Sequence, residues 1–221
     1  KAANSATMKI CLVITGASRG LGRAIAVTFA DKCQVSCAVL VARTESLLWE
    51  TEKLLVHTAE QTRVIAADLG DLDTLDSTID RILEAIKESS FDKLIFFNNA
   101  GSLGFIGPAV EIPSLSTLRQ AVDLNITSSM WLSTRIAKLD VENILIVNIS
   151  SLVAVEAFPT LSLYSAGKAA RDLFHAALAK EKIQTLNYAP GPLETDMTGE
   201  LRQAEGLDEI LKPYFAKTLV D

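Results

Sequence analysis

Short apolar segments alternate along the chain with longer segments in which apolar residues recur at helical spacing. The short segments predict strands at 9–15, 36–42, 63–68, 93–98, 143–150 and 183–189. The longer segments predict helices at about 21–31, 45–59, 71–88, 115–138, 162–181 and 200–216. Strand and helix therefore follow one another from Lys9 to about Ala216, with no Pro-, Gly- or Ser-rich linker between them.

The predicted strands are apolar throughout and do not alternate apolar with polar residues. Such strands are covered on both faces, which is typical of a parallel sheet between two layers of helices. The pattern predicts an α/β fold, a Rossmann-type doubly wound parallel sheet in three layers that forms a single domain over residues 1–221. Residues 1–8, KAANSATM, are expected to be flexible or the remnant of a cloning tag.

The composition favours a small-molecule ligand. Of the 221 residues 49% are hydrophobic, which is enough for one large core. The formal net charge of −6 and the absence of basic runs argue against nucleic acid or a membrane as partner. No apolar run is long enough to span a bilayer and no secretory signal is visible, so we expect a cytoplasmic protein. Cys11, Cys33 and Cys37 match no zinc or redox motif, so we expect reduced thiols and no metal.

A glycine-rich segment, TGASRGLG, follows the first predicted strand and opens the first predicted helix. Glycines at 16, 20 and 22 allow a tight turn and a close approach of backbone to a pyrophosphate, which the helix N-terminus attracts. Taken alone, such glycines also serve turns and helix packing, but their place after the first strand favours a dinucleotide site. The predicted cofactor loop comprises Gly16, Ala17, Ser18, Arg19, Gly20, Leu21 and Gly22.

The end of the second predicted strand favours NADP(H) over NAD(H). A carboxylate at this place would hold the ribose 2′-hydroxyl of NAD, but the chain has Ala42, Arg43 and Thr44 there. Arg43 and Arg19 would clamp a 2′-phosphate, although each is also a plausible solvated surface residue.

Two further strand ends carry cofactor candidates. Asp68, beside Leu69, would accept a hydrogen bond from adenine, or would instead cap the helix that starts near residue 71. The segment NNAG, with Asn99, Ala100 and Gly101, supplies small residues where backbone would lie close to a ribose, although alone it reads as a turn.

Ser151, Tyr164 and Lys168 form the candidate reaction centre. Tyr164 and Lys168 are four residues apart and share one helix face, and Ser151 ends the fifth predicted strand. A lysine ammonium near a tyrosine would bring its pKa towards neutrality, so that the tyrosine protonates a carbonyl oxygen during hydride transfer while the serine orients that oxygen. Taken singly, Ser151 is typical of a cap at the strand-to-helix connection, Tyr164 of a ring at the edge of the core, and Lys168 of a solvated helix lysine.

Asn125 and a proline-rich loop complete the set of candidates. Asn125 would distort the helix after NNAG by bonding backbone and water. The segment NYAPGPLETDM must turn after the sixth strand, which would leave Leu193 and the Thr195 hydroxyl free to hold a carboxamide, or it is an ordinary rigid loop.

Together, TGASRGLG, NNAG, Asn125, Ser151 and the Tyr164-x-x-x-Lys168 pair resemble the short-chain dehydrogenase/reductase family over almost the whole chain. The resemblance implies a catalytic Ser151, Tyr164, Lys168 and Asn125, with Tyr164 as general acid, and Asn99 as a support of the central strands. It also implies NADP(H) contacts by Lys168 and by the segment from Leu193 through Thr195 and Met197, substrate contacts by Ser151, Tyr164 and Gly191, and a homodimer.

Within the family, NISSL, YSAGKAARDLF and LNYAPGPLETDM are similar to the branch that reduces the side-chain carbonyls of sepiapterin and related pterins towards tetrahydrobiopterin. That branch has a further C-terminal helix and strand with a pterin-anchoring aspartate, and Asp221 matches the start of that helix and not the anchor. A broad diketone or xenobiotic carbonyl reductase, and a non-catalytic NADP-binding redox sensor, are the alternatives.

Overall fold

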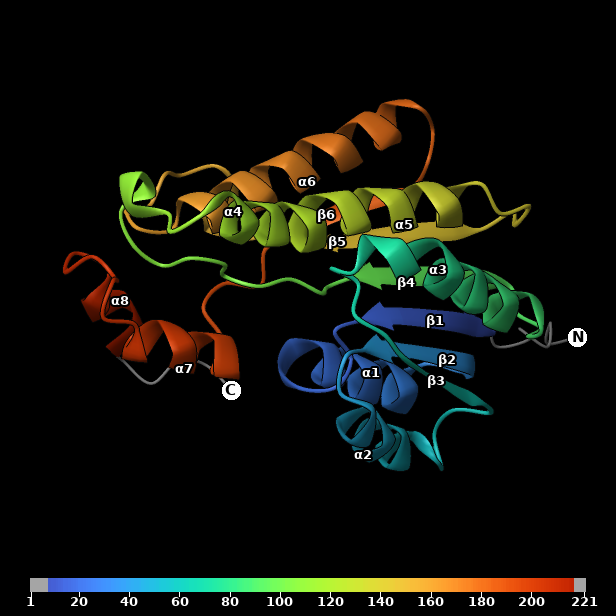
Figure 1. Cartoon of the computed structure of the whole chain (residues 1–221). Helices are drawn as coiled ribbons and strands as arrows, with labels where there is room; N and C mark the ends of the chain where they lie inside the picture. Colours follow the sequence, from blue (N-terminus) through green and yellow to red (C-terminus); the bar gives the residue numbers. More distant parts are fainter. Residues whose placement is uncertain (1–7, 217–221) are drawn as a thin grey trace, which may run out of the picture.

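The computed structural model describes residues 8–216, so the predictions for residues 1–7 and for the chain beyond 216 lie outside the described residues. Its centre is a sheet of six parallel strands in the order β3-β2-β1-β4-β5-β6 (Figure 1). The strands are β1 (Ile10–Thr15), β2 (Val35–Ala42), β3 (Thr62–Ala66), β4 (Lys93–Asn98), β5 (Ile144–Ile149) and β6 (Thr185–Tyr188). This confirms the predicted doubly wound parallel sheet. The strand order reverses between β1 and β4, where such folds bind ligands.

Helices cover the two faces of the sheet, as the continuous apolar strands required. On one face α1 (Gly20–Lys32) and α2 (Glu45–Leu55) enclose a core that includes Leu12, Leu40 and Phe97. On the other face α3 (Leu72–Lys87) and α5 (Ser129–Ala137) pack over Val13, Val39 and Phe96, with α6 (Ser162–Lys180) beside α5. Successive residues of β1 thus enter opposite cores, because side chains alternate along a strand.

The predicted helix 115–138 is interrupted. It consists of α4 (Leu115–Val122), the π-helical turn η2 (Asp123–Ser128) and α5. Asn125, in the centre of η2, bonds the backbone of Ser102 with both polar atoms of its side chain. A side chain that serves a neighbouring loop in this way explains why the regular helical ladder gives way to a wider turn here.

The prediction of one last helix at 200–216 is wrong. The structure has α7 (Asp196–Gln203) and the short α8 (Lys212–Ala216), which lie beyond the carboxyl ends of the strands (Figure 1). Between them the chain passes so close to Ile106 that a Cβ on Gly206 would lie 2.3 Å from the Ile106 carbonyl oxygen. This long-range backbone contact, invisible to helical periodicity, holds the chain out of a continuous helix.

Candidate active site

The carboxyl ends of the strands open onto a cavity of about 1260 Å³. Among the candidate site residues named from the sequence, all but Ala17 and Asn125 line it. Ala17 is fully buried beneath the glycine loop, and Asn125 is buried behind Ser102. Residues separated by up to about 180 positions therefore meet in one place, as expected for strand ends that share an edge of a parallel sheet.

The glycine loop has the shape of a phosphate cradle. Gly16 and Gly20 have φ of +69° and +51°, which glycine adopts readily. A Cβ on Gly22 would lie 2.2 Å from the Gly16 carbonyl oxygen, so only glycine lets α1 start this close to the turn. The N-terminus of α1 thereby faces the cavity, where its free amides and dipole favour an anion. The residues present fit a dinucleotide.

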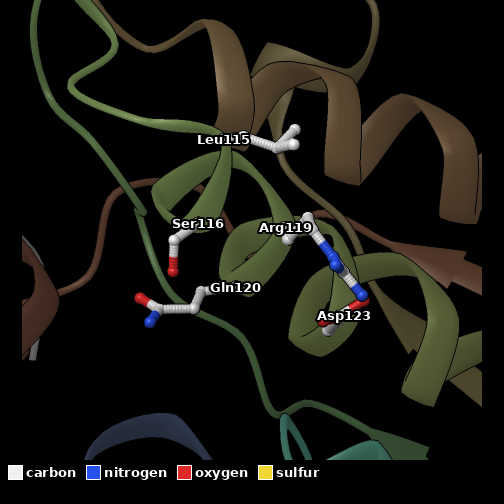
Figure 2. Close-up of a pocket in the computed structure, with 5 residues that line it drawn as sticks. All are labelled: Leu115, Ser116, Arg119, Gln120 and Asp123. Carbon is white, nitrogen blue, oxygen red and sulfur yellow. The ribbon is translucent and has the colours of Figure 1, made fainter.

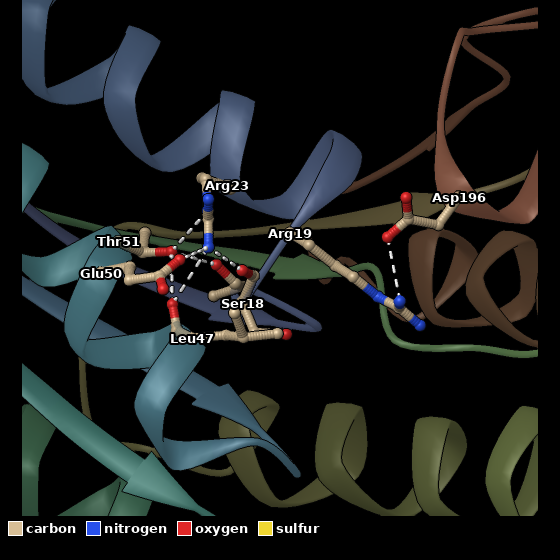
Figure 3. A network of polar contacts seen from close by, with 8 residues as sticks. Ser18, Arg19, Arg23, Leu47, Glu50, Thr51 and Asp196 are labelled. Atoms are coloured by element: carbon tan, nitrogen blue, oxygen red, sulfur yellow. Dashed lines mark hydrogen bonds and ion pairs between the residues drawn. The ribbon is translucent and has the colours of Figure 1, made fainter.

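Arg23, which sequence reasoning missed, fixes that loop to α2. Its guanidinium donates to the carbonyl oxygens of Ser18 and Leu47 at 2.5 and 3.2 Å and to the Thr51 hydroxyl at 3.0 Å (Figure 3). Thr51 in turn donates to the Ala17 carbonyl oxygen. In the sequence Arg23 reads as a polar helix residue, because its acceptors on α2, Leu47 and Thr51, are more than twenty positions away.

The two predicted phosphate-binding arginines have different surroundings. Arg43 is exposed at the end of β2, lines the cavity and forms no ion pair with any residue in the described range 8–216. Arg19 instead reaches across the cavity to α7, where its Nη1 lies 2.9 Å from Oδ2 of Asp196 (Figure 3). Both members of this pair are more than half exposed, so the contact is weak and solvent-screened.

The candidates after β3 and β4 are held by local hydrogen bonds. Asp68 accepts from the Gly70 amide, whereas the cap of α3 is Asp71, so the alternative reading of Asp68 as a helix cap is wrong. Asn99 donates to the Thr15 and Gly16 carbonyl oxygens at 2.8 and 3.3 Å. Asn99 thus joins the end of β4 to the glycine loop and supports the central strands, as the resemblance implied.

Ser151, Tyr164 and Lys168 come together at the other end of the cavity. Ser151 and Tyr164 line this end together, and Nζ of Lys168 lies 5.6 Å from the centroid of the Tyr164 ring. The same ammonium donates to the Ile149 carbonyl oxygen at 2.6 Å, which anchors it at the end of β5. The neighbouring Ser150 donates to Asp172 instead and does not join this group.

Burial and nearby polar groups shift the pKa of both Tyr164 and Lys168. Burial raises the pKa of Tyr164, and the Ser151 hydroxyl and the charge of Arg171 oppose that rise. Burial also lowers the pKa of Lys168 well below its usual value, with Arg171 adding to the effect. Arg171, which the sequence did not single out, is therefore a second cation that favours the phenolate of Tyr164, and the role of Lys168 stays a prediction.

The loop after β6 is only partly as expected. Gly191 has φ of +80°, which permits the turn. The Leu193 carbonyl oxygen accepts from the Thr198 hydroxyl and the Thr195 hydroxyl oxygen caps α7, so these two oxygens are not free as expected; contact of the loop with a carboxamide stays a prediction. These bonds fix the entry into α7 beside the cavity.

Comparison with known proteins identifies the family. A family model described as short chain dehydrogenase matches residues 10–206. The chain belongs to the short-chain dehydrogenase family.

This short-chain dehydrogenase is 35% identical over 207 residues to a sepiapterin reductase of Xenopus tropicalis, covering 89% of this chain and 78% of the relative. It is 37% identical over 199 residues to a sepiapterin reductase of Mus musculus, covering 84% and 75%. A solved short-chain dehydrogenase from Sphingobium yanoikuyae in complex with NADPH superimposes with a TM-score of 0.73 at 26% identity, over 90% of this chain and 75% of that one. The protein is therefore an oxidoreductase that acts on carbonyl or CH–OH groups.

Other kinds of site are absent from the described part of this short-chain dehydrogenase. Within residues 8–216 no three His, Cys, Asp or Glu side chains are placed to hold a metal ion. No helix in the same range is long and apolar enough to cross a membrane. A second, shallower pocket on α4 is lined by Leu115, Ser116, Arg119, Gln120 and Asp123 (Figure 2). It contains no residue that the sequence singled out.

Proposed function

We propose that this short-chain dehydrogenase reduces the side-chain carbonyl of a pterin such as sepiapterin, with NADPH as hydride donor and Tyr164 as proton donor. The observation that carries the proposal is the placement of Ser151, Tyr164 and Lys168 in the same cavity as the glycine loop. The similarity to sepiapterin reductases over most of the chain supports the substrate class.

The cofactor would lie along the cavity from the glycine loop to the triad. Gly16, Gly20 and Gly22 leave room for its phosphates, and Arg43 would place a positive charge beside the 2′-phosphate of NADPH. When bound, NADPH supplies a hydride. The absence of a carboxylate at the end of β2 supports NADPH over NADH.

The triad would deliver the proton that the reduced oxygen needs. The raised pKa of Tyr164 keeps its hydroxyl protonated at neutral pH, ready to donate to a carbonyl oxygen that gains negative charge. Ser151, which lines the same end of the cavity, would orient the same oxygen and stabilise its charge. Lys168 keeps one N–H on Ile149 and has two more donors, which suit a ribose. Asn125 holds the backbone of Ser102 behind the site.

An apolar wall suits a flat substrate ring. Leu103, Leu161 and Leu201 form a buried cluster with Phe158 and Tyr164 at the triad end. This cluster joins α7 to the body of the protein, so the substrate would be enclosed between α7 and the strand ends.

A second candidate is the reduction of small vicinal diketones. The chain is 34% identical over 194 residues to an L-2,3-butanediol dehydrogenase of Corynebacterium glutamicum, covering 84% of this chain and 72% of that one. Turnover of sepiapterin and of the diketone benzil with NADPH separates the two candidates. We expect higher kcat/KM for sepiapterin, and a strong preference for benzil would overturn the pterin proposal. NADPH binding without oxidation by either substrate would support a redox sensor.

We also propose a homodimer formed through the helices that carry Asn125 and Tyr164. Leu115 of α4 and Leu173 of α6 are 71% and 75% exposed, which leaves apolar surface at the outer sides of these helices. Light scattering after gel filtration should give twice the chain mass, and Leu173→Glu should reduce it to that of one chain. A monomeric wild type would refute the proposal.

We propose a cytoplasmic location because the described cysteines are free thiols. Cys11, Cys33 and Cys37 are all free, and none is placed in a disulfide. Cell fractionation would test it, and recovery from a secreted fraction would contradict it.

A further inference from the structure

Arg171 is the largest fully buried side chain among the described residues. It lies three residues after Lys168 and seven after Tyr164, so all three share one face of α6. Its Nε donates to Asn148 Oδ1 at 2.8 Å and its Nη1 donates to the Ala100 carbonyl oxygen at 2.9 Å. Its Nη2 donates to the Asn98 carbonyl oxygen. One guanidinium thus joins α6 to the ends of β4 and β5.

The surroundings place this charge next to the reaction centre. A Cβ on Gly101 would lie 3.7 Å from Nη1 of Arg171 and 3.1 Å from Oδ1 of Asn125, so Gly101 is squeezed between the two side chains. Side chains on a helix lean towards its N-terminus, which directs Arg171 towards Lys168 and Tyr164.

The charges around Arg171 are few. On α6 the titratable neighbours are Tyr164, Lys168, Asp172 and His175. The strand side chains that bond Arg171 are neutral, namely Asn148 of β5 and Asn98 of β4. Asn125 of η2 lies on the other side of Gly101, and Ser133 of α5 bonds His175, one helical turn further along α6. Asp172 accepts from Asn148 and Ser150 at 2.8 and 2.6 Å and does not pair directly with Arg171.

A buried charge without an ion-pair partner is expensive, and a methionine or leucine would fill the same space at lower cost. Hydrogen bonds to four acceptor atoms on three residues explain how Arg171 is tolerated, but neutral donors would satisfy the same acceptors. We propose that Arg171 is a positioning residue for proton transfer: it locks the ends of β4 and β5 against α6, and its charge stabilises the deprotonated form of Tyr164. This inference rests on the proposed role of Tyr164 in carbonyl reduction.

The test is the pH dependence of hydride transfer in single-turnover reactions with NADPH and sepiapterin. Reduction requires protonated Tyr164, so the rate falls as pH rises through the pKa of that group. A positive charge about 10 Å away, the rise of seven helical residues, changes such a pKa by about one unit at an effective dielectric constant of about 20. In Arg171→Met we expect the alkaline fall in rate to move about one unit towards higher pH.

Three further variants isolate the charge. Arg171→Lys keeps the charge and should return the alkaline fall in rate close to its wild-type pH, although with a lower rate because an ammonium cannot reproduce the spacing of the guanidinium's hydrogen bonds. Asp172→Asn removes a negative charge at nearly constant shape and should move the alkaline fall in rate towards lower pH. Lys180→Met, on the exposed end of the same helix, should leave it unchanged.

A cofactor-free readout complements the kinetics. The pKa of Tyr164 can be measured by ultraviolet titration of tyrosinate, taken as the difference between each protein and its Tyr164→Phe counterpart. This pKa should be higher in Arg171→Met than in the wild type and lower in Asp172→Asn. If the pH–rate profile and the tyrosinate titration were the same in wild type, Arg171→Met and Asp172→Asn, the inference would be overturned. If Arg171→Met fails to fold, the profiles of Asp172→Asn and Arg171→Lys decide. A wild type that oxidises NADPH with neither sepiapterin nor benzil would instead overturn the proposed function, and the tyrosinate titration would still test Arg171.

Discussion

His175 is buried, and we expect its burial to make the protein less stable as the pH falls. The side chain is fully buried, with Nδ1 2.8 Å from the Arg171 carbonyl oxygen and Nε2 2.9 Å from the Ser133 hydroxyl. Since a carbonyl oxygen only accepts, Nδ1 carries the proton of the neutral ring and Nε2 accepts from Ser133. Burial, with the charge of Arg171 adding to it, lowers the pKa of His175 from 6.5 to about 4.

The unfolded chain therefore binds the extra proton between pH 6.5 and about 4, where the folded protein does not. The free energy of unfolding is lost as pH falls through this window, by about 3 kcal/mol in full and by about 2 kcal/mol between about pH 7 and about pH 5. Urea unfolding at the two pH values measures the loss. His175→Gln should be less stable at neutral pH but should lack this part of the acid dependence.

Exposed His57 offers the matched control. His57→Gln should keep the wild-type loss of stability on acidification, because its side chain is in water in both states. If wild type and His175→Gln lost the same free energy between the two pH values, His175 would not be held neutral by burial, and the reasoning would be refuted.

The remaining predictions concern the cofactor end. Gly22→Ala places a Cβ 2.2 Å from the Gly16 carbonyl oxygen, and an overpacking cost of about 1–3 kcal/mol should weaken NADPH binding about 5- to 150-fold in a fluorescence titration; unchanged affinity would contradict the cradle. Arg43→Asp should reverse the ratio of kcat/KM for NADPH and NADH by at least about tenfold, since it exchanges a phosphate-binding cation for a ribose-binding carboxylate; an unchanged ratio would show that Arg43 does not face the 2′-phosphate. Asp196→Asn releases Arg19 and should tighten NADPH, but not NADH, by about two- to fivefold, the scale of an exposed ion pair; equal effects on both cofactors would place Arg19 away from the phosphate.

The sheet and the location of the site could be predicted because both depend on local sequence. Each strand is a run of apolar residues between polar ends, and the glycine loop follows one such run directly. Once the strands are parallel, Gly16, Asn99 and Ser151 must share an edge.

Features that depend on distant contacts escaped prediction. The chain between α7 and α8 follows the backbone of Ile106. Arg171 reads as an ordinary helix cation until the fold places it against Asn98, Ala100 and Asn148. A useful signal was its spacing from Tyr164, since seven residues return a helix to the same face.

The central claim is that Tyr164 gives the proton in a reduction driven by NADPH. Tyr164→Phe removes the hydroxyl, keeps the ring, and leaves the glycine loop untouched. We predict that the rate of NADPH oxidation with sepiapterin falls by at least about a hundredfold, the usual contribution of a general acid, while the Kd for NADPH stays nearly unchanged. Full activity in Tyr164→Phe would contradict the account.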